Sequence, residues 1–132
     1  MSQAKIFKRG DMSTILTVAY ITRMPSPEMW GSKDRKMRVL TNAGLFIKPQ
    51  DRIPGLDELG IGDFFNTTIY GTDADEIIKS CKHGSKVFYV GKWNPKKKTM
   101  WTMSIVPLES KKETDIRRKR NEELKVGSRG NN

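Results

Sequence analysis

Aromatic and basic residues stand close together at two points of the chain. Trp30 is followed by a cluster of cations that begins at Lys33, and Trp93 and Trp101 flank the lysine-rich segment 94–98. A flat aromatic ring can cover the face of an unpaired base, while lysine and arginine side chains can follow the phosphates of the same strand. Each stacked base contributes about 1–3 kcal/mol, so a few rings are enough for binding without sequence readout. These residue types suit a surface for single-stranded nucleic acid.

The segment 63–70 carries aromatic residues at both odd and even positions. If it is a strand, alternate side chains point to opposite faces, so Phe64 and Tyr70 share one face with polar neighbours. Phe65 falls on the other, apolar face. We therefore expect Phe64 and Tyr70 to be exposed and to stack on bases, whereas Phe65 and Phe88 are expected to pack in the core.

The predicted contacts fall into two groups. Base stacking is predicted for the aromatic side chains of Trp30, Phe64, Tyr70, Trp93 and Trp101. Phosphate contacts are predicted for the basic side chains of Lys33, Arg35, Lys36, Arg38, Lys92, Lys96, Lys97 and Lys98. Packing across a hairpin explains Trp93 and Trp101 equally well. The alternative for Trp30 is packing against the rest of the fold, and for the three consecutive lysines it is an ordinary solvated turn.

Residue types that carry out catalysis are sparse. His83 is the single histidine, so no triad can be built around it. Asp73, Asp75 and Glu76 could hold a divalent cation in a nuclease, but they begin a predicted helix, where the helix dipole favours acids. Neither a phosphate-binding glycine loop nor a metal-binding His/Cys spacing is present. We expect no enzyme activity, no cofactor and no metal site.

Composition narrows the class of protein. The chain has 132 residues, enough for one domain, and its formal net charge of +10 favours polyanionic partners. A single cysteine, Cys81, excludes an internal disulfide and fits a reducing compartment. There is no apolar run of about 18 residues and no apolar signal-peptide region near the N-terminus. These features predict a cytoplasmic protein without a membrane span.

Five extended segments, rich in β-branched and aromatic residues, are predicted strands at 12–22, 36–48, 63–70, 85–93 and 99–108. One helix is predicted over 72–84, with acids first, bases last and Gly84 as its stop. Three strands, a helix and two strands is the order of the OB-fold, a five-stranded barrel whose second and third strands bind oligonucleotides. The expected fold class is therefore all-β with one helix. The interruption at 42–44 could be a bulge or could end the second strand.

The composition changes after the last predicted strand. Residues 111–132 contain eight Lys or Arg, four Asp or Glu and no aromatic residue. The part around 113–124 could form a short helix with internal salt bridges, but it has too few apolar residues to dock firmly. We therefore expect an OB-fold domain at 1–110 and a mobile basic tail at 111–132.

Residues 63–71, 74–76 and 83–91 resemble the pattern of bacterial-type single-stranded DNA-binding proteins. In that family an aromatic residue opens the third strand, as Phe64 does here, and another precedes the glycine at its end, as Tyr70 does here. A Lys-Gly-Ser turn and a Val-aromatic-apolar-x-Gly strand follow the helix. The resemblance extends more loosely to the first and last predicted strands.

By this resemblance Phe64 takes the place of a base-stacking tryptophan and Tyr70 that of a base-stacking phenylalanine. Trp93 lies near the family's stacking aromatic on the arm between the last two strands. The resemblance also implies a homo-oligomer, a dimer or tetramer assembled partly through the first strand, although phage members can be monomers. The basic end of this chain differs from the acidic, aromatic-tipped peptide by which cellular members recruit replication proteins. This difference favours a phage or plasmid protein whose tail touches DNA.

Together these patterns predict sequence-tolerant binding and protection of single-stranded DNA during replication or recombination, in a bacterial or phage-infected cell. The expected partners are single-stranded DNA and proteins of replication or recombination. Two alternatives stay open. One is a primosome-type OB-fold adaptor that mainly binds a replication protein. The other is binding of single-stranded RNA, because stacking surfaces do not by themselves read the 2′-hydroxyl.

Overall fold

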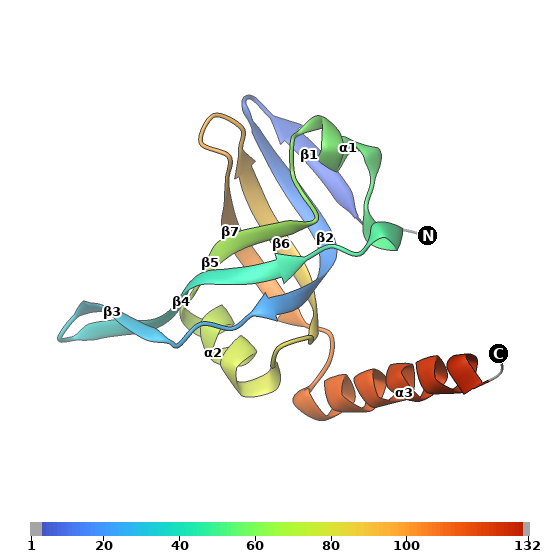
Figure 1. The fold of residues 1–132 in the computed structure, drawn as a ribbon. Coiled ribbons are helices and arrows are strands. Elements are labelled where there is room, and N and C mark those ends of the chain that lie inside the picture. Colours follow the sequence, from blue (N-terminus) through green and yellow to red (C-terminus); the bar gives the residue numbers. More distant parts are fainter. Residues whose placement is uncertain (1–3, 131–132) are drawn as a thin grey trace.

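The computed structural model describes residues 4–130, and it is mostly β (Figure 1). The strands are β1 (Lys5–Arg9), β2 (Met12–Arg23), β3 (Glu28–Ser32), β4 (Arg35–Phe46), β5 (Phe64–Tyr70), β6 (Lys86–Asn94) and β7 (Thr99–Pro107). The helical segments are η1 (Pro49–Asp51), α1 (Pro54–Glu58), α2 (Gly71–Ser80) and α3 (Lys111–Gly130). All five predicted strands are present within two residues of their expected bounds.

The strands form one antiparallel sheet in the order β5-β4-β2-β6-β7, with β1 added beside β2 and β3 beside β4. β5 and β7 lie in contact, yet among the described residues no backbone ladder joins them. The expected five-stranded barrel is therefore wrong in this respect: among the described residues the sheet has seven strands and is open.

Side chains bridge the opening between β5 and β7. The Thr67 hydroxyl donates to the Met100 carbonyl at 3.1 Å, and it is hydrogen bonded to the hydroxyls of Thr102 at 2.6 Å and Tyr89 at 3.0 Å. These polar atoms are buried, so each needs a partner, and they find it in one another. The two edges thus meet through hydroxyl groups where a ladder would otherwise run.

Two short strands were not predicted. β1 pairs with the first half of β2 across the two-residue loop Gly10-Asp11, a preferred hairpin sequence. β3 pairs with the start of β4 across Lys33-Asp34, and the two form an arm that projects from the rest of the sheet (Figure 1). Gly31 is required in this arm, because a Cβ there would lie 2.0 Å from the Arg35 carbonyl oxygen.

The interruption at 42–44 is a bulge. β4 continues to Phe46, and its register against β5 shifts between Leu40 and Ala43. Asn42 takes a φ of 62°, which asparagine tolerates better than most residues. A Cβ on Gly44 would lie 2.8 Å from the Arg23 Cβ, so glycine lets β2 and β4 approach here. The bulge bends β4 without ending it.

Helical structure is more extensive than the single predicted helix. α2 ends at Ser80, four residues before the expected stop, and packs the buried Ile77 onto the sheet. The segment 49–62, expected to be a loop, contains η1 and α1, and Leu56 of α1 is fully buried. No helix among the described residues combines the length and apolar character needed to cross a membrane.

One apolar cluster fills the interior. Its largest fully buried members are Tyr89, Ile15, Leu40, Leu45, Ile47, Leu56, Ile69, Ile77 and Ile105. Phe65 packs against this cluster, as predicted, with its ring 5.2 Å from that of Tyr89. The same prediction for Phe88 is wrong, because Phe88 is half-buried on the outer face of β6. Phe88 shares the outer face of β6 with Lys86, Lys92 and Asn94, whereas Tyr89 lies on the inner face, where its hydroxyl finds polar partners.

Residues 111–130 form the helix α3, which lies beside the end of the sheet (Figure 1). A capping box begins the helix: the Glu113 amide donates to the Ser110 hydroxyl, and the Ser110 amide donates to the Glu113 carboxylate. Its first turns are held by polar contacts, among them Arg117 with Glu109 at 2.6 Å. The mobility expected for this tail stays a prediction, and its last residues, 131 and 132, lie outside the described residues.

Candidate nucleic-acid interface

The outer face of β5 carries the residues that alternation assigned to it. Phe64, Asn66, Thr68 and Tyr70 are exposed or half-exposed, whereas Thr67 and the other inward residues pack inside. Phe64 is 67% exposed, and its ring stacks on that of Phe46 with centroids 4.6 Å apart and planes at 24°. The prediction that Phe64 and Tyr70 share the outer face is therefore confirmed.

Trp30 reaches the other end of β5 from the arm. Its ring is 41% exposed and meets the Tyr70 ring edge-on, with centroids 6.1 Å apart and planes at 66°. Trp30 lies opposite Met37 in the β3–β4 register, so both side chains point to one face of the arm. Aromatic side chains thus mark both ends of the β5 face.

A groove of about 670 Å³ runs between β5 and the β6–β7 turn. Phe64, Asn66 and Thr68 line one side, and Lys98 and Thr99 line the other. The groove lies along the edge of β5 that no ladder joins to β7 among the described residues. It is open to solvent and combines one exposed ring with polar and cationic groups.

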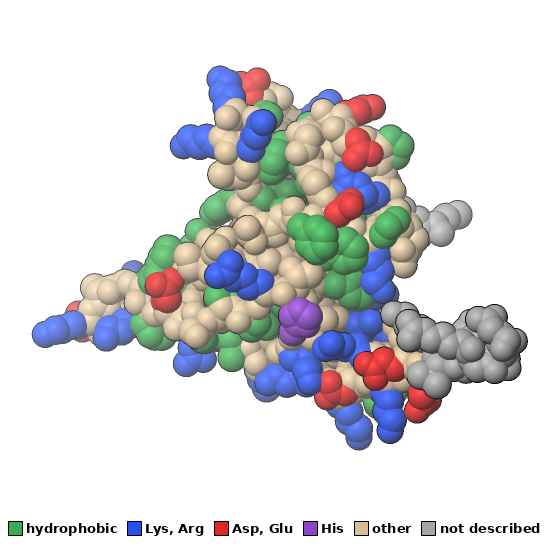
Figure 2. Space-filling view, viewed as in Figure 1, with side chains coloured by type: hydrophobic (Ala, Val, Ile, Leu, Met, Phe, Trp, Pro, Cys, Tyr) green, Lys and Arg blue, Asp and Glu red, His purple; other side chains and the backbone are tan. Residues whose placement is uncertain are grey.

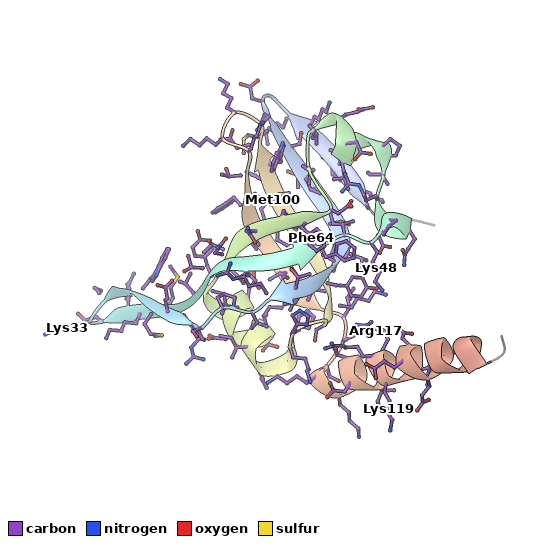
Figure 3. The ribbon with its side chains drawn as sticks, viewed as in Figure 1. Lys33, Lys48, Phe64, Met100, Arg117 and Lys119 are labelled. Carbon is purple, nitrogen blue, oxygen red and sulfur yellow. The ribbon has the colours of Figure 1, made fainter. Side chains whose placement is uncertain are left out.

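Cations stand at both sides of the β5 face (Figure 2). The arm carries the exposed cations Lys33, Arg35, Lys36 and Arg38. Figure 3 shows Lys33 at the tip of the arm, and Arg38 forms an ion pair of 3.5 Å with Asp75 of α2. That pair partly neutralises Arg38. Lys33, Arg35 and Lys36 are therefore more available to a polyanion than Arg38 is.

The β6–β7 turn carries the other predicted cations. Lys96, Lys97 and Lys98 are exposed. The Asn94 side chain accepts hydrogen bonds from the backbone amides of Lys96 at 3.0 Å and Lys97 at 3.2 Å, which fixes the turn. The three ammonium groups thus project from an ordered turn beside the groove.

Trp93 does not lie where it was predicted to act. It is only 6% exposed and belongs to the core, and its indole nitrogen donates to the Leu59 carbonyl at 3.0 Å. It shares the inner face of β6 with Tyr89, because their positions differ by an even number. Trp93 lines part of the groove, but its ring is too buried to stack on a base in this arrangement.

Trp101 and Lys92 lie opposite each other in the β6–β7 register, on the outer face of that hairpin. Trp101 is 54% exposed and Lys92 is half-buried. Neither lines the groove beside β5. The structure therefore brings Trp30, Phe64 and Tyr70 to one surface and leaves these two residues beside it, on β6 and β7.

Four residues at the end of the sheet were missed by the sequence reasoning. Phe46 underlies Phe64, and Tyr20 lies opposite Phe46 in the β2–β4 register. The Lys48 ammonium lies 4.0 Å from the centre of the Tyr20 ring, and the Arg117 guanidinium lies 5.2 Å from it. Phe46 and Lys48 lay in a predicted strand, but that they adjoin Phe64 and Tyr20 follows only from the tertiary structure.

Two titratable groups of the core have pKa values that burial raises. Burial raises the pKa of Tyr89 to about 12, although hydrogen bonds with Thr102 and Thr67 partly oppose that shift. Burial likewise raises the pKa of the Cys81 thiol to about 11, so this thiol is protonated at neutral pH. Among the described residues, no three His, Cys, Asp or Glu side chains gather as metal ligands would.

Comparisons with protein-family models, with curated proteins and with solved structures find no match to this chain. The function of the chain is therefore inferred from the geometry of the β5 face, its groove and the cations around it.

Proposed function

We propose that this protein binds single-stranded DNA without sequence preference and protects it during replication or recombination, as a non-enzymatic cytoplasmic protein. The observation that carries the proposal is Phe64, a largely exposed ring already stacked on Phe46 at the edge of a groove between two cationic projections. A base stacked on Phe64 would extend that stack, and the lysines of the arm and of the β6–β7 turn would meet its phosphates.

The strand order supports an OB-fold as the core of the molecule. β2, β4, β5, β6 and β7 would be its five strands, with α2 between the third and the fourth. OB-folds are partly open barrels, and the loops that contact oligonucleotides are those between strands one and two and between strands four and five. In this chain those connections are the β3–β4 arm and the β6–β7 turn. Membership of the single-stranded DNA-binding family is part of the same proposal.

Single strands are favoured over duplexes for a geometric reason. In a duplex the faces of the bases are covered by their neighbours, so an exposed ring gains nothing by stacking. In a single strand each base can turn onto Phe64 or Trp30 while the phosphates stay in water beside the lysines. RNA is the variant of this proposal that a parallel titration with oligo-U tests.

The first test replaces the exposed ring. Phe64→Ala removes one stacking platform, and we expect affinity for oligo-dT to fall about 5- to 150-fold, the equivalent of about 1–3 kcal/mol. Phe7→Ala is the matched control, because Phe7 is also an exposed phenylalanine but lies on β1. Fluorescence titration measures both variants. Equal losses in the two, or no binding of any single strand by the unchanged protein, would sink the proposal.

The adaptor alternative draws on a different surface. β7 exposes Trp101, Met103 and Val106 on its outer face, which would suit a protein partner. Under that alternative the double substitution of Phe64 and Tyr70 by Ala keeps partner binding, whereas under the leading proposal it abolishes DNA binding.

Homo-oligomers remain part of the proposal, with one constraint. β1 pairs with β2 from Met12 to Leu16. This edge of β2, the first strand of the proposed OB-fold, is therefore already covered by the chain's own β1. A dimer or tetramer assembled through that edge would have to displace β1.

A further inference from the structure

A row of aromatic side chains crosses the sheet from the groove towards α3. Phe64 lies opposite Phe46, Phe46 lies opposite Tyr20, and Tyr20 lies opposite Lys86, each pair being in direct antiparallel register. Directly opposed residues of antiparallel strands point to the same face, so these four side chains form one line across β5, β4, β2 and β6. The line begins at the ring proposed to stack on a base.

Cations from three elements gather at the far end of this row. Lys48 follows β4 and Arg117 comes from α3, and both lie over the Tyr20 ring. Lys86 of β6 also acts electrostatically on Tyr20, as do the carboxylates Asp51 and Glu109. Three cations and two carboxylates leave an excess of positive charge at this end of the sheet. Figure 3 shows Phe64, Lys48 and Arg117 following one another from the start of β5 towards α3.

Hydrophobic burial does not account for the position of α3. Over 111–124, the part of the helix whose side chains are described, the single buried residue is Thr114, and Ile116 and Leu124 are exposed. The helix is instead held by polar contacts: Arg117 donates to Glu109 and to the Gly84 carbonyl, and Thr114 is hydrogen bonded to Ser85 at 2.7 Å. This docking holds the Arg117 guanidinium group beside Tyr20, the last ring of the aromatic row.

We propose that a bound single strand continues from Phe64 across Phe46 to a phosphate site formed by Lys48, Lys86 and Arg117. This inference rests on the proposed function and extends it, because it makes α3 part of the nucleic-acid surface. Bases follow the aromatic row, and a phosphate accepts hydrogen bonds from the two ammonium groups at its end. From Phe64 the bound strand then extends in two directions, over β5 towards Trp30 and over the end of the sheet towards α3.

The experiment compares two lengths of oligo-dT at several salt concentrations. A strand of about 4 nucleotides can occupy the groove alone, whereas one of about 16 nucleotides can reach both ends, these being the limits of known OB-fold site sizes. The variant Lys48→Gln/Lys86→Gln removes two proposed phosphate contacts and leaves Arg117 to hold α3. The control is Lys112→Gln/Lys119→Gln, which makes the same change of charge on exposed positions of α3. Lys119 points away from the sheet (Figure 3).

For the long strand we expect the log–log salt slope to become shallower by about 1.4 in the Lys48/Lys86 variant, since each phosphate contact contributes about 0.7. The short strand should bind the variant as it binds the unchanged protein, and the control should change neither slope. Each single substitution should give about half the change, which keeps the test readable if the double variant is unstable.

Other outcomes separate this inference from the proposed function. If both lengths bind the unchanged protein and the two double variants behave alike, the path to α3 is overturned while the binding function stands. A short strand that weakens as much as the long one also overturns it, because the cations would then belong to the groove. If neither length binds the unchanged protein, the proposed function itself fails.

Discussion

Trp93 and Trp101 flank the β6–β7 turn, but Trp93 is buried and Trp101 is exposed. Trp93 lies on the inner face of β6, where its indole N–H reaches the Leu59 carbonyl after α1, whereas Trp101 lies on the outer face of β7. A buried indole N–H needs an acceptor, and the one it finds ties the helical segment 49–62 to the sheet. Trp93 is thus a packing residue, and the exposed indoles available to a ligand are those of Trp30 and Trp101.

Replacing Trp93 tests this assignment. Trp93→Phe removes the N–H donor and leaves the Leu59 carbonyl without it, so we expect the free energy of unfolding to fall by about 1–3 kcal/mol. Affinity for oligo-dT should stay unchanged, because the ring does not reach a base. Urea unfolding and an oligo-dT titration give the two quantities. The control is Trp101→Phe, an exposed position where stability should change by less than about 0.5 kcal/mol. A loss of affinity at full stability would contradict the packing role.

At the scale of elements, one carboxylate collects several of the contacts that hold α3 beside the sheet. Glu109 accepts hydrogen bonds from Arg117, from the Lys86 amide at 3.0 Å and from Thr114 at 3.1 Å. Burial raises the pKa of Glu109, but these hydrogen bonds outweigh it, so the net shift is downward. A carboxyl whose pKa is lowered by folding stabilises the docked state above its unfolded value near 4.5, and that contribution is lost as the pH falls through the lowered value.

Acid should therefore release α3 before it unfolds the sheet. We expect NMR order parameters of the amides in 115–124 to stay high at neutral pH and to fall only as the pH drops below about 4.5, while those of β2 and β6 stay high. Glu109→Gln keeps an acceptor but removes the charge, so its α3 should be mobile already at neutral pH and nearly independent of pH below it. An α3 that stays rigid in the Gln variant would show that Glu109 does not hold the helix.

At the scale of the whole molecule, the positive charge of the chain is distributed around the β5 face. The arm and the β6–β7 turn extend on either side of it, and α3 lies beyond the end of the aromatic row (Figures 1 and 2). With about five phosphate contacts the log–log salt slope would be near −3.5. Binding by this surface should therefore weaken steeply with salt, although the aromatic contribution persists.

The three lysines of the β6–β7 turn are the group of cations that can be removed with the least change elsewhere in the structure. The triple variant Lys96→Gln/Lys97→Gln/Lys98→Gln should make the salt slope for a long oligo-dT shallower by about 2, because up to three phosphate contacts are lost. A triple variant of exposed α3 lysines, Lys111→Gln/Lys112→Gln/Lys119→Gln, changes the net charge equally and should leave the slope almost unchanged. Equal effects of the two triples would mean that net charge, and not the turn, governs binding.

Much of the architecture could be read from the chain. The alternation of side chains along a strand predicted Phe64 and Tyr70 on the outer face and Phe65 on the inner face, and turn residues separated the five long strands. The hairpin sequence Gly10-Asp11 and the capping box that starts at Ser110 were also present, and they mark β1 and the start of α3. These features are local, because side-chain alternation, turn type and helix capping depend on residues a few positions apart.

Tertiary structure decided the rest. The hydroxyl cluster of Tyr89, Thr67 and Thr102 joins three strands, so no local pattern could predict it. The row from Phe64 to Lys86 joins four strands through register alone. The residue types alone showed which side chains could stack and which could carry charge. Which of them meet depends on contacts between residues far apart in the chain, and those arise only when the sheet pairs and the hydroxyl groups of its two edges find one another.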